Sequence, residues 1–327
     1  MKILEKVRIG KLELRNRIVM PPMNTELASE SGEVTSELID HYSARAPWLG
    51  MVVVEHSYVV PEGRLSPRQP GVHDDRLLEG LTDLAEAVKS AGTRAAIQIN
   101  HAGEKCKPDL IGEKPVAPSP SKTARALTVD EIVELTDAFG AAAARAAGSG
   151  FDAVEIHGSH GFLLSQFQSP LKNQRQDEYG GSLENRMRFP VEVVRRVRRE
   201  IGSSVQLWYR LGADDRMEGG NTIEDGIRMA SVLASEGVDV FDVSGGICGS
   251  RPPGLDGPGY FAYAASAIRK ATGLPVVAVG GITKPTEAEE VLERWDVDLL
   301  AVGRALLKNP LWGKKAYEKG SKVGPRR

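Results

Sequence analysis

The chain has 327 residues, of which 41% are hydrophobic and 26% charged, and its formal charge at pH 7 is −2. This composition is typical of a globular enzyme, and it excludes the basic field of a nucleic-acid-binding protein. Two cysteines, Cys106 and Cys248, are too few for a disulfide framework or an iron–sulfur cluster. No run approaches the roughly 18 apolar residues of a membrane span, and the opening MKILEKVRIGK lacks an apolar export core. We therefore expect a cytoplasmic protein without membrane or nucleic-acid partners.

The first predicted element is a hairpin in KVRIGKLELRN, with its turn at Gly10. After it, apolar runs alternate with amphipathic segments in about eight pairs, the number that a TIM (β/α)8 barrel needs, and we expect the hairpin to close the barrel floor. Helices are predicted at Val129–Ala147 and at Leu183–Glu200, the latter capped by Ser182. No linker divides the chain, so residues 1–327 are expected to form a single barrel domain. The strands are predicted at Arg17–Met20, Gly50–Glu55, Arg94–Ile99, Ala153–Ile156, Val205–Tyr209, Val238–Val243, Val276–Val279 and Leu299–Val302.

Polar and small residues follow these strands, at the rim where a TIM barrel carries its chemistry. Because all eight strands end at the same rim, we expect these residues to line one site. They are Pro22, Met23 and Asn24 after the first strand, Gln98, Asn100 and His101 at the third, His157 and His160 at the fourth, Arg210 at the fifth, and Gly280–Gly281 and Gly303–Arg304 after the last two.

The two imidazoles, His157 and His160, suit the task of holding a carbonyl or another developing oxyanion. A metal site normally needs a third protein ligand, and HGSHGF offers no Glu or Cys at ligand spacing, so a metal is the less favoured use. An isolated pair of this spacing is more often a pair of hydrogen-bonded loop histidines. Its position after a barrel strand favours the functional reading.

The two glycine-containing ends, Gly280–Gly281 and Gly303–Arg304, indicate a phosphate site. Loops after the last two strands commonly bind phosphate in this fold, and Arg304 adds a forked cation. The alternative is that the glycines make tight turns and Arg304 is a surface charge.

Five segments carry a family resemblance that spans nearly the whole chain. They are KLELRNRIVMPPMNTE, QINHAGEK, VEIHGSHGFLLSQFQSPLKNQRQDEYGGSLENRMRF, VVAVGGITKPTEAEE and LLAVGRALLKNP. In this order and spacing the chain closely resembles the old yellow enzyme family of FMN-dependent ene-reductases. The resemblance implies a TIM barrel that binds FMN. It also implies that hydride from NADH or NADPH is passed to an activated alkene in a ping-pong mechanism.

The resemblance also implies roles for individual residues. His157 and His160 would hold the carbonyl oxygen of the substrate. Asn24 would lie near the flavin C4 carbonyl, where the family often has Thr or Cys, and a guanidinium at Arg210 would stabilise negative charge near flavin N1. The FMN contacts would come from Pro22, Met23, Asn24, Gln98, Arg210, Gly280, Gly281, Gly303 and Arg304, and the substrate pocket from His56, His101, Phe162 and Tyr260. His56 and His101 are also compatible with purely structural roles.

The chain departs from the family at Phe162, where the family usually has the tyrosine that protonates the substrate. Phenylalanine has no proton to give. Water or the hydroxyl of Tyr58, Tyr260 or Tyr263 would have to supply it, unless the favoured substrate needs no fast proton transfer.

Alternatives remain open at this stage. The barrel could reduce enoyl-CoA, dienoyl-CoA or steroid-like enones, or be a flavin-free phosphate-binding lyase, although the usual Schiff-base lysine is missing from the strand ends. A larger iron–sulfur flavoenzyme is disfavoured by chain length and cysteine count, and a non-catalytic flavin-binding protein is a further alternative. The resemblance implies a homo-oligomer, a dimer or tetramer, in which Gly324–Arg327 would reach a neighbouring site.

Overall fold

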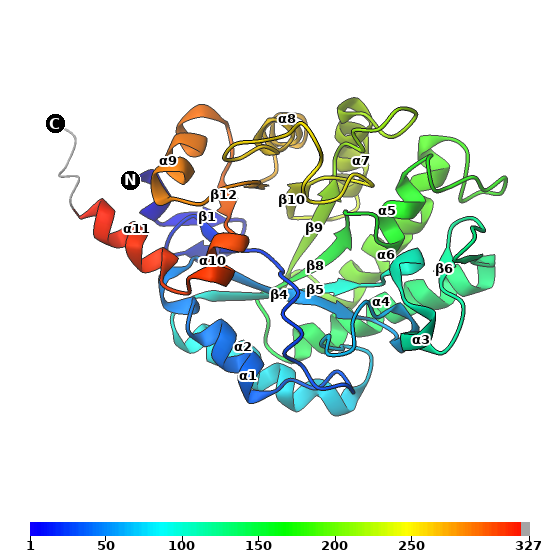
Figure 1. Cartoon of the computed structure of the whole chain (residues 1–327), viewed down its shortest axis with the longest axis horizontal. Coiled ribbons are helices and arrows are strands. Elements are labelled where there is room, and N and C mark those ends of the chain that lie inside the picture. Colours follow the sequence, from blue (N-terminus) through cyan, green and yellow to red (C-terminus); the bar gives the residue numbers. More distant parts are fainter. Residues whose placement is uncertain (322–327) are drawn as a thin grey trace.

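Parallel strands close into an eight-stranded barrel within residues 1–321, the part of the chain that this computed structural model describes (Figure 1). The seam joins the last strand to the first, with Leu300 opposite Ile18 and Ala301 opposite Val19. The predicted TIM barrel is therefore confirmed, and each predicted strand overlaps an observed one. In sheet order the strands are β10 (Val240–Ser244), β11 (Val276–Val279), β12 (Leu299–Ala301), β3 (Ile18–Met20), β4 (Met51–Tyr58), β5 (Arg94–Asn100), β8 (Ala153–Gly158) and β9 (Gln206–Gly212).

Helices surround the barrel and cover the outward-facing side chains of the strands (Figure 1). Short 3-10 turns, η2 (Ala46–Trp48), η3 (Pro61–Gly63) and η4 (Asp75–Leu77), occur in the connections. The helices are α1 (Ser36–Ser43), α2 (Leu78–Ser90), α4 (Val129–Gly148), α5 (Leu163–Gln168), α6 (Leu183–Ile201), α7 (Ile223–Ser235), α8 (Ala262–Thr272), α9 (Pro285–Arg294), α10 (Arg304–Lys308) and α11 (Trp312–Gly320).

The two helices predicted with bounds, α4 and α6, are both confirmed. Helix α4 begins with a capping box, because the Thr128 hydroxyl accepts from the Glu131 amide and the Glu131 carboxylate accepts from the Thr128 amide. Helix α6 begins after Ser182, whose hydroxyl accepts from the Asn185 amide, as the sequence predicted.

A hairpin of β1 (Val7–Ile9) and β2 (Leu12–Leu14) follows the short helix η1 (Lys2–Leu4) and closes the amino-terminal end of the barrel. Gly10 turns the chain at φ +55°, and a Cβ there would lie 2.5 Å from Nε2 of Gln206. That same Nε2 donates to the carbonyl of Ile9 at 2.6 Å. The apolar hairpin residues pack with inward-facing side chains of the strands, which confirms the predicted floor.

One excursion between β5 and α4 was not predicted. It contains η5 (Gly103–Lys105), α3 (Pro108–Ile111) and a parallel pair of two-residue strands, β6 (Val116–Ala117) and β7 (Arg125–Ala126). Figure 1 shows it at one side of the barrel, close to α5 and α6. Among the helices up to residue 321, none is long and apolar enough to cross a membrane.

The barrel lining changes from apolar to polar toward the carboxyl ends of four neighbouring strands. Deep in the interior, Ala96, Ala153, Trp208 and Val240 pack with the hairpin. Because strand side chains alternate, the residues two positions further along face the same interior. These are Gln98 on β5, Glu155 on β8, Arg210 on β9 and Asp242 on β10, and we call them the polar layer.

Candidate active site

The polar layer is a buried charge cluster at the carboxyl-terminal half of the barrel. Each of its residues is at most 5% exposed. Gln98 Nε2 donates to Glu155 Oε1 at 2.7 Å, and Arg210 Nε lies 3.5 Å from Asp242 Oδ2. Two carboxyl groups thus face one guanidinium in an environment of low polarity.

Electrostatics favour a proton on this carboxyl pair. Burial, and after it the neighbouring Asp242, raise the pKa of Glu155 to about 8, although Arg210 and the hydrogen bond from Gln98 oppose the rise. Burial also raises the pKa of Asp242, although Arg210 acts against it. Near neutral pH one proton therefore stays on the pair, which leaves Arg210 balanced by a single negative charge.

Several buried atoms of this region have no protein partner. Gln98 Oε1, both amide atoms of Asn100 and Arg210 Nε make no hydrogen bond with any described residue. Buried polar atoms are normally satisfied. Amide atoms and a guanidinium nitrogen without hydrogen-bond partners at a barrel rim indicate a site for a ligand with both donors and acceptors.

A cavity of about 540 Å³ extends from Arg210 across the ends of β11, β12 and β3. A Cβ at Gly280 would lie 2.6 Å from the Tyr260 ring, and one at Gly303 would lie 2.8 Å from Met23 Sδ. Glycine therefore lets the backbone pack directly against Tyr260 and Met23, which both line the cavity. It is lined by Pro21, Met23, Arg210, Ser250, Arg251, Leu255, Asp256, Gly257, Tyr260, Val279, Gly280, Gly281, Ile282, Thr283, Ala301, Gly303, Arg304, Ala305 and Lys308.

Besides Arg210, three cations lie in this cavity lining. Arg304 was predicted there, and the structure adds Arg251 and Lys308, which sequence reasoning missed. Lys308 is one helical turn after Arg304, so the spacing in the sequence could have predicted that both lie on the same face of the helix. The Arg304 guanidinium donates to the Tyr260 hydroxyl at 3.1 Å, and this hydroxyl donates to the Ser250 carbonyl at 2.7 Å.

His157 stands at the end of β8, directly opposite Arg210 in the strand register. Its Nδ1 accepts from the Ser159 amide at 3.3 Å. Burial lowers its pKa well below the ordinary value, and nearby His160 and Arg210 add to the effect, so the ring is neutral. Because Nδ1 is the acceptor, Nε2 carries the proton, and no described residue accepts it.

His160 lies beside His157, with 5.3 Å between the ring centroids. Its backbone adopts the left-handed region at φ +58°, and its amide donates to the Gly245 carbonyl at 2.9 Å. Its Nε2 lies 2.7 Å from the Ser244 hydroxyl, a partner that sequence reasoning missed. Burial lowers the pKa of His160 well below its ordinary value, so it too is neutral, and Nδ1 is left for a ligand.

The other predicted pocket histidines have different surroundings. His56 lies 6.4 Å from His157 and 5.6 Å from Phe162, by ring centroids, and its Nδ1 contacts Gln69 Nε2 at 2.9 Å. His101 accepts from the Gly103 amide and lines a separate cavity of about 230 Å³. No hydrogen bond or ring contact among the described residues joins His101 to the histidine pair, so the structural role that the sequence allowed fits its position.

Of the residues that follow β3, only some line the 540 Å³ cavity. Met23 lines the 540 Å³ cavity together with Pro21, whereas Pro22 is buried outside its lining. Asn24 is exposed, and its Oδ1 lies 3.5 Å from the Ser66 hydroxyl. The next residue, Thr25, is held by the buried Glu55 carboxylate, which fixes this loop over the barrel.

The three tyrosines considered as proton donors all use their hydroxyls elsewhere. Tyr58 donates to the Ser31 carbonyl at 3.2 Å, Tyr263 donates to Asp214 Oδ2 at 3.0 Å, and Tyr260 contacts Ser250 as described above. None of these bonds involves the histidine pair.

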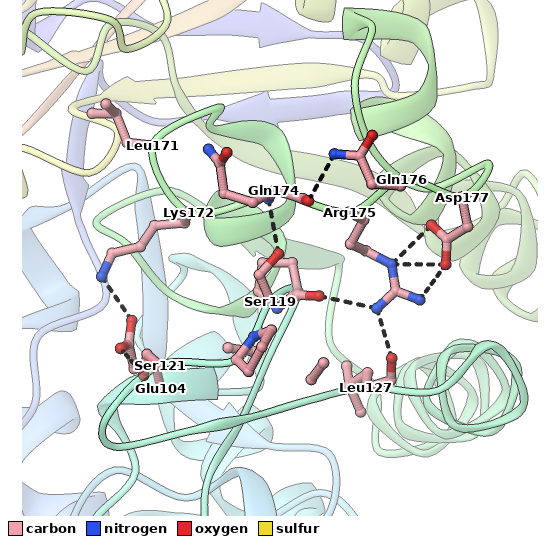
Figure 2. A pocket seen from close by; sticks show the side chains of 14 residues that line it. Glu104, Ser119, Ser121, Leu127, Leu171, Lys172, Gln174, Arg175, Gln176 and Asp177 are labelled. Carbon is pink, nitrogen blue, oxygen red and sulfur yellow. Dashed lines mark hydrogen bonds and ion pairs between the residues drawn. The ribbon is translucent and has the colours of Figure 1, made fainter.

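A further cavity, of about 640 Å³, separates the excursion from the loop after α5 (Figure 2). Lys172 and Glu104 face each other at one side of it, with Nζ 2.7 Å from Oε2. At the other side, Arg175 pairs with Asp177 and donates to the carbonyls of Pro118 and Leu127. These bonds hold the excursion in place, and the cavity includes neither histidine of the pair.

Comparisons with known proteins agree on one family. The model described as the NADH:flavin oxidoreductase / NADH oxidase family matches residues 2–322. The chain is 44% identical over 324 residues to an NADH oxidase of Thermoanaerobacter brockii, with 95% of this chain and 50% of that protein covered, so it spans about half the length of that relative. It is 38% identical over 319 residues to an NADPH dehydrogenase of Halalkalibacterium halodurans, covering 96% of this chain and 94% of that protein.

A solved structure with a similar fold is the old yellow enzyme homologue from Zymomonas mobilis. The TM-score is 0.84 at 26% sequence identity, and the match covers 100% of this chain and 94% of that chain.

Proposed function

Since the chain belongs to the NADH:flavin oxidoreductase / NADH oxidase family, the old yellow enzyme family, and is an NAD(P)H-dependent flavin oxidoreductase, we propose that its reaction is the ping-pong reduction of α,β-unsaturated carbonyl compounds. NADH or NADPH is the hydride donor. The observation that carries this proposal is the free Nε2–H of neutral His157, which stands opposite Arg210, a residue that lines the 540 Å³ cavity. The proposal covers residues 1–327 as one FMN-binding barrel domain.

The lining of the 540 Å³ cavity fits FMN. Arg251, Arg304 and Lys308 supply positive charge for a phosphate, and the close backbone at Gly280, Gly281 and Gly303 leaves room for it. When bound, FMN accepts hydride from the nicotinamide and passes it to the alkene.

The orphaned atoms of the polar layer fit the pyrimidine edge of a flavin. Gln98 donates an amide N–H hydrogen bond to Glu155. The Oε1 atom of Gln98 is left as an acceptor for the flavin N–H. Arg210 places positive charge where the reduced flavin becomes negative. Pro22 and Met23 would pack near the ring, and Asn24 would approach its C4 carbonyl.

The histidine pair would hold the substrate carbonyl. His157 donates through Nε2 and His160 through Nδ1, provided that the Ser244 hydroxyl donates to His160 Nε2. Neutral donors fixed before the reaction stabilise the enolate oxygen without any reorganisation. His56, Phe162 and Tyr260 would line the substrate side, and His101 would support that wall from behind.

We further propose a cytoplasmic homo-oligomer, a dimer or tetramer, with a small-molecule alkene as the partner. Gly324–Arg327, expected to reach a neighbouring site, lie outside the described residues.

The test is an anaerobic titration of the purified protein with NADH and then NADPH, followed by 2-cyclohexenone. We expect the visible flavin band to bleach with one or both donors and to return with the enone. If the band returns only with oxygen, the enone assignment is wrong. If instead an acyl-CoA enone but no simple enone restores the band, the substrate class moves to CoA esters.

A further inference from the structure

Phe162 stands beside the histidine pair at the position where the family usually has a hydroxyl acid. Phe162 occupies the wall there, with its ring centroid 4.4 Å from that of His157 and its surface only 7% exposed. The ring packs with Ala102 and Cys106 in a small apolar cluster, in which the Cys106 thiol is the one side-chain group with an ionisable proton. Burial raises the pKa of Cys106 to about 12, and its Sγ is directed to the Glu62 carbonyl at 3.3 Å.

An ammonium group fills the space next to this wall. Lys105 is the last residue of η5, and its Nζ lies 5.0 Å from the centroid of the Phe162 ring, over the ring. The same Nζ donates to the main-chain carbonyl of His160. A Cβ at Gly161 would lie 3.4 Å from Lys105 Cε, so the lysine stem lies along the histidine loop. Lys105 therefore contacts both the second histidine and the residue in the place of the usual acid.

Nothing neutralises this ammonium. Within residues 1–321, no carboxylate lies within the 4.0 Å ion-pair distance of Lys105 Nζ. The adjacent Glu104 is turned away, because it pairs with Lys172 at 2.7 Å and accepts from the Ser121 hydroxyl at 2.7 Å (Figure 2). Of the three N–H bonds of Lys105, one is used by His160. The remaining donors have no hydrogen-bond acceptor among the described residues.

We propose that Lys105 is the proton donor that completes alkene reduction in place of the missing tyrosine. The inference rests on the proposed function. As hydride forms the bond to the β carbon, the enolate held by the histidines takes a proton from Nζ. A C–H bond forms at the α carbon, one N–H bond breaks, and a neutral amine remains. Lys105 is exposed to solvent, so water returns the proton before the next turnover.

The acidity of Lys105 suits this step. Desolvation by the surrounding protein and the positive charge of Lys172 lower its pKa from the ordinary value. Ordinary lysine and tyrosine side chains have pKa values of about 10.4 and about 10. The lowered pKa therefore brings the acidity of Lys105 closer to that of the phenol that the family usually has. The charged groups that bear on this site are Lys172 and Glu104, and the titratable but neutral groups are His157 and His160.

Lys105 also donates to the carbonyl of His160 and so stabilises the left-handed turn there. The experiment therefore has to distinguish a proton donor from a residue that only holds this turn. Lys105→Met removes both functions. Lys105→Arg keeps a cation and a donor for the His160 carbonyl, but its guanidinium cannot release a proton. Lys107→Met is the matched control, because Lys107 is exposed and makes no contact with the site.

Stopped-flow measurements would follow both half-reactions of the FMN-containing enzyme. We expect Lys105→Met and Lys105→Arg to slow reoxidation of the reduced enzyme by 2-cyclohexenone about 100-fold, the size of a general-acid contribution. Four other quantities should stay at the values of the wild type and of Lys107→Met. They are the rate of flavin reduction by NAD(P)H, the rate of reoxidation by ferricyanide, the FMN content and the thermal midpoint. Ferricyanide is informative because its reduction needs no proton on carbon. The wild-type enone rate should fall as the pH rises through the pKa of Lys105, and this fall should be absent in Lys105→Met.

Restoration of the hydroxyl gives the decisive comparison. Phe162→Tyr in the Lys105→Met background should recover most of the enone rate. The proposal is overturned if Lys105→Arg reduces the enone at the wild-type rate, since the hydrogen bond to His160 would then be sufficient. It is also overturned if Lys105→Met slows reoxidation by ferricyanide as much as reoxidation by the enone. A wild-type enzyme that is reoxidised by ferricyanide but never by an enone would instead overturn the proposed function, and the role of Lys105 with it.

Discussion

At the scale of single residues, the site depends on a few polar groups placed in an apolar barrel. The histidines and Arg210 could be predicted, because they follow strands that apolar runs identify. Glu155 and Asp242 were missed, although Glu155 is the only charge in the predicted strand Ala153–Ile156 and Asp242 stands one position before the end of the predicted strand Val238–Val243. Lys105 could not be found, because its contacts with His160 and Phe162 join segments far apart in the chain.

Glu155→Gln should change how stability depends on pH. The folded protein keeps a proton on Glu155 up to a pKa of about 8, whereas the unfolded chain releases it at about 4.3. The contribution of Glu155 to the free energy of unfolding is thus fully present below its pKa in the unfolded chain, and it is lost as the pH rises toward about 8. We expect the free energy of unfolding in urea to fall less between about pH 5 and pH 9 in Glu155→Gln than in the wild type.

The exposed Glu290→Gln provides the control for this comparison and should follow the wild-type curve. Parallel curves for Glu155→Gln and the wild type would mean that the buried pair holds no extra proton.

At the scale of elements, strands and long helices were predictable because their apolar periodicity is strong. The excursion was not, since β6 and β7 have two residues each and carry no periodic signal. Their pairing depends on backbone bonds, such as Arg125 to Pro115 at 2.9 Å, and on the tie between Arg125 and Glu131 at the start of α4. The capping box of α4 therefore also anchors the excursion.

Thr128→Ala should remove the cap of α4. Because one helix amide loses its acceptor, we expect the free energy of unfolding to fall by about 1 kcal/mol. Thr136→Ala on the same helix is the matched control, since the Thr136 hydroxyl only contacts the carbonyl of Ile132 within the helix. Urea unfolding checks both variants, and equal stability of the two would contradict a role for the cap.

At the scale of the whole molecule, the two ends of the barrel have separate tasks. The hairpin closes the amino-terminal end with apolar side chains, and the candidate site occupies the carboxyl-terminal end. The TIM barrel and its floor were predictable from the count and order of the elements. The distribution of polar and apolar residues inside the barrel was not, because it depends on which face of each strand points inward.

Leu14→Ala should therefore weaken the fold without changing the site. Leu14 is fully buried in the floor, and truncation of a buried leucine costs about 2–5 kcal/mol. We expect a lower urea midpoint, with FMN content and the NAD(P)H reduction rate per bound flavin unchanged. Leu311→Ala, at a largely exposed leucine, is the control. A loss of FMN affinity equal to the loss of stability would show that the two ends are coupled.

The seam between β12 and β3 bears on how the protein reaches its native state. The cavity takes Met23 from just after the first strand of the barrel and Gly303 from just after the last, and these two residues touch across the seam. Contacts between such distant parts of a chain form late, because the intervening loop must first be closed at an entropic cost. Quenching of flavin fluorescence during refolding would consequently report the moment at which the ring of strands is complete, and nascent chains that lack the last strand would leave the cofactor in solution.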